Sequence, residues 1–149
     1  MDLYSEINYN LYLTLEETSS ENDIKVRQNA EEKIKKLAQE NLGTLLIDLS
    51  NIMSDKEIKN EIRQISFKVF QKILMLPRFY ENYLYLSSGI KNKIKERLFK
   101  GFDSEEQNIR ISAALAIYAY VKLNYREMNF YLFLIFLLII SKKKVLMFK

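Results

Sequence analysis

A short pattern that recurs three times constrains the fold more than any other feature. Each copy consists of a β-branched apolar residue, an arginine and, three residues later, a small residue, and the copies start at Val26, Ile62 and Ile109. A large apolar residue follows the small residue at four positions, and further apolar residues follow it at seven and eight positions, which marks one face of a helix. The starts lie 36 and 47 residues apart, a period typical of stacked helical hairpins. The sequence therefore predicts an all-α fold, a right-handed α-α superhelix of about two and a half repeats.

The residue types that are scarce in this chain exclude several classes of protein. Three glycines and one proline indicate long helices with few breaks. The absence of histidine and cysteine removes the commonest general base and the usual zinc ligands. Neighbouring carboxylates such as Glu31 and Glu32 diverge on a helix, so they do not form an acid–base pair. We therefore expect no enzyme, no metal site and no cofactor.

The net charge of the chain and its first ten residues indicate which partners and which cellular compartment to expect. The formal net charge of +4 comes with lysines clustered at 33–36 and 91–100. These lysines fall opposite the apolar stripe of their helices, which favours a solvated face over a phosphate-binding surface. The first ten residues lack the pattern of a secretion signal. We expect a protein of the cytosol or nucleus.

Apolar spacing and capping residues predict where the helices begin and end. The expected helices are a short first one ending near residue 18, then 24–40, 44–53, 54–76, one around 90–100 closed by Gly101, and a last one from 104. Residues 78–88 are expected to form a loop with one turn of helix. Gly43 is expected to take a positive φ in a tight corner, with Thr44 as the cap of the following helix. Ser54 with Glu57, and Ser104 with Gln107, have the spacing of a capping box.

Two predicted helices carry clear apolar faces. For 24–40, the residues expected to be buried are Val26, Ala30, Ile34, Leu37 and Ala38. For 44–53, they are Leu45, Leu46, Leu49, Ile52 and Met53.

The order and spacing of several segments resemble one known family. The first segment combines Arg27, Ala30, Glu31, Ile34 and Leu37. It is followed by residues 41–46 with Leu49 and Ser50, then by Ile62 with Arg63, and finally by Ile109 with Arg110 and Ala113. Over residues 11–129 the chain resembles the amino-terminal HEAT repeats of the importin-beta superfamily, the karyopherins. The resemblance implies an importin-beta N-terminal-like HEAT-repeat solenoid over 1–127, with repeats at 19–53, 54–101 and, in part, 103–127. In such arrays the repeated arginine, here Arg63, bridges adjacent repeats.

The resemblance also implies a function. A Ran-type small GTPase in its GTP form would bind a concave face lined by the second helix of each early repeat, in support of protein import into the nucleus. The expected contact residues are the polar positions of two such helices, Asp48, Asn51, Lys91, Asn92 and Lys95, and the alternative for each is a solvated surface residue. Transport cargo or nucleoporins would be further partners if the array is longer, and no direct nucleic-acid partner is expected. The implied location is the cytoplasm and the nucleus.

Residues 128–149 differ in character from the rest of the chain. Eleven consecutive apolar residues, 130–140, are followed by three lysines, 142–144. As a helix, the run would extend about 17 Å, against roughly 30 Å for the core of a bilayer. We interpret it as an apolar helix without a covering repeat rather than as a membrane anchor. The rival functional hypothesis is a generic HEAT-repeat adaptor, associated with a membrane through this tail.

Overall fold

A computed structural model describes residues 7–21 and 23–124, and the tail 128–149 lies outside this part of the chain. The described residues contain helices and no strand, which confirms the predicted all-α fold. The α-helices are α1 (Tyr9–Thr18), α2 (Ile24–Glu40), α3 (Leu42–Ser54), α4 (Asn60–Met75), α5 (Tyr80–Leu84), α6 (Ser88–Phe102) and α7 (Gln107–Asn124), and the 3-10 helix is η2 (Pro77–Phe79).

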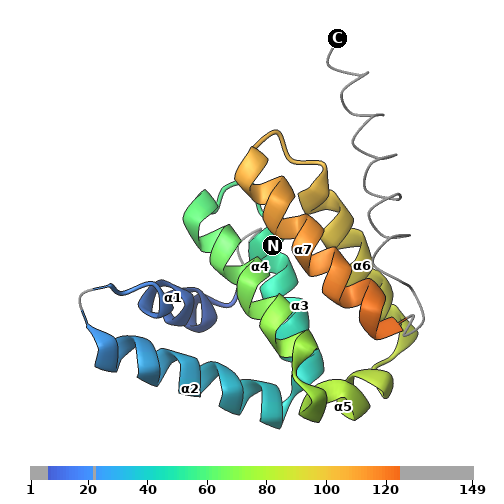
Figure 1. The fold of residues 1–149 in the computed structure, drawn as a ribbon, viewed down its shortest axis with the longest axis horizontal. Coiled ribbons are helices and arrows are strands. Elements are labelled where there is room, and N and C mark those ends of the chain that lie inside the picture. The colour runs from blue at the N-terminus through green and yellow to red at the C-terminus, as the bar shows by residue number, and fades with distance from the viewer. Residues whose placement is uncertain (1–6, 22, 125–149) are drawn as a thin grey trace, which may run out of the picture.

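Four long helices form two layers. Figure 1 shows α4 and α7 side by side in front of α3 and α6, and the main helix contacts agree, because α3 packs on α4 and α6 while α7 packs on α4 and α6. The chain runs up α3 and down α4, then up α6 and down α7. The hairpin of α1 and α2 lies at one end, where α1 contacts α3 and α4 and α2 contacts α3. This is a stack of helical hairpins, as the repeated pattern predicts.

The closest antiparallel helix pairs lie across the connectors between the predicted repeat ranges. The ranges 19–53 and 54–101 would pair α2 with α3 and α4 with α6. In the structure α4 packs mainly on α3 and α7, and α6 packs on α3 and α7. Residues 76–87, with η2 and α5, separate α4 from α6 in sequence, so the short connectors at 55–59 and 103–106 form the close antiparallel pairs instead.

Helix α3 lies at the centre of the fold, where it contacts α1, α2, α4, α5 and α6. Its five predicted core residues are all buried, together with Leu42 and Gly43. A helix with so wide an apolar face is stable only when several other helices cover it. The hydroxyl of Ser66 on α4 donates a 2.8 Å hydrogen bond to the carbonyl oxygen of Leu49. Arg97 on α6 donates one of 2.9 Å to the hydroxyl of Ser50.

Helix α2 has the predicted bounds but a narrower buried face. Ala30, Ile34 and Ala38 are buried, and Val26 is half-buried. Leu37 is 40% exposed, so its predicted burial is wrong. It lies at the rim of a groove between α2 and α1 with Leu11 and Thr14. The short helix α1 covers too little of α2 to enclose this side chain.

The start of α3 corrects the role predicted for Gly43. No glycine among the described residues has a positive φ, and Gly43 lies in the first turn of α3. The N-cap is Asn41, whose side-chain oxygen accepts from the backbone N–H of Thr44 at 3.1 Å. A Cβ atom at Gly43 would stand 3.0 Å from Cδ2 of Leu86. The glycine therefore serves close packing rather than a turn.

Three other predicted helix ends are also wrong. The hydroxyl of Ser54 donates to the carbonyl of Ser50 at 2.8 Å, so Ser54 completes α3, and α4 begins only at Asn60. Asp55, not Ser54, accepts from the N–H of Glu57. Ser104 accepts from the N–H of Glu106 at 3.1 Å, one residue before the predicted partner. Gly101 lies inside α6, which ends at Phe102.

Candidate partner-binding surface

The five predicted contact residues come from two helices that pack side by side, α3 and α6. Asp48 and Asn51 lie on α3, and both are half-buried. Lys91, Asn92 and Lys95 lie on α6, where Lys91 is half-buried and the other two are exposed. Whether these residues face one common surface depends on the contacts that each makes within the fold.

The side chain of Asp48 forms a hydrogen bond with another residue of the fold. Its Oδ2 accepts a 3.0 Å hydrogen bond from the side-chain amide of Asn8. Asn8 is the N-cap of α1, where its side-chain oxygen accepts from the N–H of Leu11 at 3.1 Å. The carboxylate of Asp48 thus orients the amide that caps α1, and it faces the α1 side of α3.

Lys91 also has partners inside the fold. Its Nζ donates to the carbonyl oxygen of Leu84 at 3.2 Å and lies 5.2 Å from the centre of the Tyr83 ring. The backbone carbonyl of Lys91 accepts a 3.1 Å hydrogen bond from the hydroxyl of Tyr120 on α7. This lysine joins the α5 connector to α6, and its ammonium group faces Tyr83 and Leu84.

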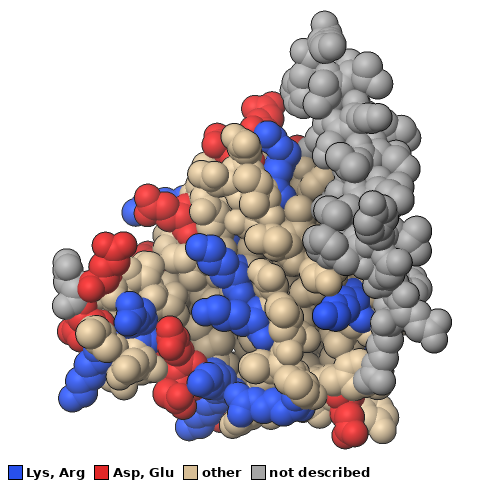
Figure 2. Space-filling view, viewed as in Figure 1, with Lys and Arg blue, Asp and Glu red and all other residues tan. Residues whose placement is uncertain are grey.

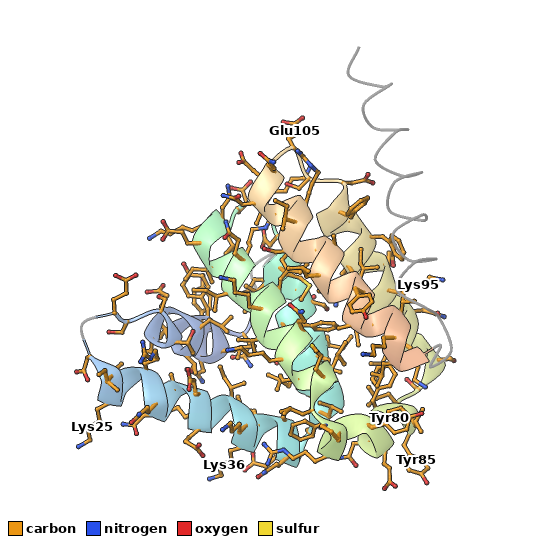
Figure 3. All side chains as sticks on the ribbon, in the orientation of Figure 1. Lys25, Lys36, Tyr80, Tyr85, Lys95 and Glu105 are labelled. Atoms are coloured by element: carbon orange, nitrogen blue, oxygen red, sulfur yellow. The ribbon has the colours of Figure 1, made fainter. Side chains whose placement is uncertain are left out.

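Lys95 points away from α3. Arg97 contacts Ser50 on α3, and two residues correspond to about 200° around a helix, so Lys95 lies on nearly the opposite side of α6. Figure 3 shows Lys95 at the edge of the molecule farthest from α1 and α2. Asp48 faces α1, so the structure does not bring the five residues together on one surface. Asn92 and Lys95 form an exposed edge of α6.

The face formed by α4 and α7 was missed by the sequence analysis. Its exposed residues are Glu61, Lys68, Lys72 and Met75 on α4, and Ile111, Leu115 and Lys122 on α7. Figure 2 shows basic side chains gathered over the middle of this face, along α4, and further ones over α2. The available signal was the spacing of Ile111 and Leu115, two large apolar residues four positions apart that lie outside the buried stripe of α7.

The lysine cluster at 33–36 lies on the exposed side of α2, as expected for a solvated face. Lys33, Lys35 and Lys36 are exposed. The ammonium group of Lys35 lies 3.6 Å from a carboxylate oxygen of Glu32. These lysines and Arg78 line one side of an open groove of about 840 Å³, together with two glutamates.

Neither a metal cluster nor a membrane-spanning helix occurs in the part of the chain that the structure describes. Across residues 7–21 and 23–124 no three carboxylates gather as ligands of an ion would. Within the same residues no helix combines the length and the apolar character needed to cross a bilayer.

Comparisons with known proteins support the fold. No protein-family model matches the chain, and no curated protein matches it in sequence. A solved structure of Kap95p, an importin-beta, superposes with a TM-score of 0.71 at 23% sequence identity. The match covers 77% of this chain and 14% of that chain, so the protein spans a small part of its length. It confirms the predicted HEAT-repeat fold.

Proposed function

We propose that this chain binds a Ran-type small GTPase, preferentially in its GTP form, and supports protein import into the nucleus as an importin-beta-like HEAT-repeat module of the cytoplasm and nucleus. The match to Kap95p over 77% of the chain supports this proposal. In the matched structure, Kap95p binding induces the switch loops of RanGDP to adopt the GTP-bound conformation.

A physical argument gives the expected nucleotide preference. The switch loops of small GTPases are ordered by the γ-phosphate and are released after hydrolysis. A partner that stabilises the GTP-like conformation of these loops has to bind the GTP form more tightly, because a ligand shifts an equilibrium only by its difference in affinity. A tenfold preference corresponds to about 1.4 kcal/mol.

Of the five predicted contact residues, Asn92 and Lys95 provide the clearest test. Both are exposed on α6. Asp48 is hydrogen-bonded to Asn8, and Lys91 is hydrogen-bonded to Leu84. Replacing either residue would therefore change the stability of the fold as well as binding of the GTPase. Asn51 is half-buried. We therefore propose the exposed edge of α6 as the part of the predicted set that contacts the GTPase.

The test is a titration of the full chain with a Ran-type GTPase loaded with a GTP analogue or with GDP. We expect at least tenfold tighter binding of the GTP-analogue form, and weaker binding by the double variant Asn92→Ala, Lys95→Glu. Lys93→Glu, with the same charge change at a neighbouring exposed position, is the matched control. Binding of neither form would overturn the proposal and leave the generic adaptor hypothesis. Equal binding of both forms would overturn the nucleotide preference and indicate nonspecific contact through lysines.

A further inference from the structure

An apolar groove lies where the end of α4 meets the end of α7. It has a volume of about 350 Å³ and opens to solvent. Its main lining residues are Met75, Leu76, Pro77, Tyr80, Tyr118 and Leu123. The side chain of Met75 is 57% exposed. A methionine that is exposed beside other apolar side chains is typical of a contact surface.

The apolar surface continues from this groove along α7. Leu115 is 50% exposed and Ile111 is 52% exposed. Residues 111, 115, 118 and 122 follow the spacing of one helix face, so Ile111 and Leu115 lie on the same side as the groove-lining Tyr118 and Lys122. The groove and the exposed apolar residues that continue it, from Leu123 to Ile111, extend about 18 Å along α7, and this whole surface is called the α7 groove below. A straight apolar segment of similar length would cover it.

We propose that residues 130–140 of this chain bind along the α7 groove, running antiparallel to α7. This segment is an uninterrupted run of eleven apolar residues, and a helix of that length extends about 17 Å, which matches the groove. Ile111, Leu115 and the groove residues other than Lys122 are apolar, so contact with an apolar segment removes apolar surface of both from water.

The described part of the chain ends beside the groove, which supports residues 130–140 as the segment that binds there. Helix α7 ends at Asn124, next to Leu123, which lines the groove. The five residues 125–129 can extend about 17 Å, which is enough to reverse direction and place residue 130 at the near end of the groove. The segment after the reversal then runs toward Ile111.

Charge complementarity supports the antiparallel direction. In this direction the three lysines at 142–144 arrive near the start of α7. Glu105 and Glu106 are exposed there, and Figure 3 shows Glu105 at the end of α7 opposite the groove. Opposite charges at this end favour the antiparallel arrangement over the parallel one, which would place the lysines at the end near Lys122.

The absence of cysteine from the chain allows a direct test by disulfide trapping. Leu115→Cys is combined, one variant at a time, with cysteine at Ile135, Phe136, Leu137 or Leu138 in the full chain, followed by mild oxidation. We expect at least one pair to form a disulfide within the monomer, seen as faster migration on a non-reducing gel that reductant reverses. The control places the first cysteine at Leu13, which is 53% exposed on α1 at the other end of the molecule.

Two results of the trapping experiment would overturn the proposal. A covalent dimer as the main product would show that a second copy occupies the groove. No disulfide for any pair, or equal trapping from Leu13→Cys, would show that residues 130–140 do not bind there.

Limited proteolysis provides a second measurement that does not depend on disulfide geometry. Leu115→Glu places a charge in the groove, so trypsin should cleave after the lysines at 142–144 at least several-fold faster than in the unmodified chain. Leu13→Glu should leave that rate unchanged, and circular dichroism verifies that both variants stay helical. Equal cleavage rates for the two variants would overturn the proposal, as would co-sedimentation of the unmodified chain with phosphatidylcholine vesicles through this segment.

Discussion

The Nε of Arg63 donates a 3.0 Å hydrogen bond to the carbonyl oxygen of Met53, and this contact ties α4 to the last turn of α3. The arginine side chain is 5% exposed. Burial lowers the pKa of Arg63, and the carboxylates of Asp55 and Glu106 oppose that change. Carbonyl groups in the last turn of a helix have no partner within it, so the guanidinium supplies one. Arg63, the second arginine of the repeated pattern, thus connects α4 to α3.

The first prediction concerns this contact. Arg63→Ala should lower the free energy of unfolding by about 2 to 3 kcal/mol, because it removes a charged hydrogen bond and leaves a buried carbonyl without a donor. Urea denaturation followed by circular dichroism measures the change. Lys56→Ala, at an exposed position, is the control and should change stability by less than about 0.5 kcal/mol. Equal stability of the two variants would contradict the role of Arg63.

A second prediction compares two glycines of α6. A Cβ atom at Gly101 would lie 2.5 Å from Cζ of Phe67, a side chain that is fully buried and cannot move aside. Gly101→Ala should therefore destabilise the fold by about 1 to 3 kcal/mol. At Gly89 the nearest atom would be 3.9 Å away, so Gly89→Ala should stabilise by about 0.5 kcal/mol through helix propensity. Thermal denaturation should show shifts of opposite sign, and a stabilising Gly101→Ala would refute the close approach of α6 to Phe67.

A third prediction separates two lysines that the sequence analysis placed on one surface. Lys91→Ala should lower stability by about 1 kcal/mol, because it removes a hydrogen bond to Leu84 and a cation–π contact with Tyr83. Lys95→Ala should leave stability unchanged within about 0.5 kcal/mol, since Lys95 is exposed. Chemical denaturation of both variants measures the difference. If Lys95→Ala were the more destabilising change, the orientation of α6 described above would be incorrect.

Sequence periodicity predicted the fold well because the spacing of apolar residues along each helix shows which side of that helix is buried. The stripe of Ala30, Ile34 and Ala38 identified α2, and the apolar face of Leu45, Leu46, Leu49, Ile52 and Met53 identified α3. Helix starts were less predictable, because a hydroxyl such as that of Ser54 can serve the preceding helix as well as the following one.

The candidate surface was harder to predict than the fold for a related reason. Periodicity tells which side of one helix is polar, but not how two helices are rotated relative to each other. Asp48 and Lys95 are both polar positions on neighbouring helices, yet Asp48 faces α1 while Lys95 faces away from α3. That relation depends on contacts such as Arg97 with Ser50, between residues 47 positions apart in sequence.

The last prediction concerns pH and Tyr12 on α1. Burial raises the pKa of the Tyr12 phenol above its usual value of 10.0, and the charge of Glu16 and a hydrogen bond to it act in the same direction. The folded state thus holds the phenolic proton more tightly than the unfolded chain, so the resulting stability is fully present below pH 10 and is lost as the pH rises through the folded pKa. The free energy of unfolding should therefore fall more steeply between pH 9 and pH 11 in the unmodified chain than in Tyr12→Phe, as measured by urea titrations at several pH values. Glu16→Gln, which keeps the tyrosine but removes the neighbouring charge, should show an intermediate slope; identical slopes for all three proteins would show that the tyrosine proton is not linked to folding.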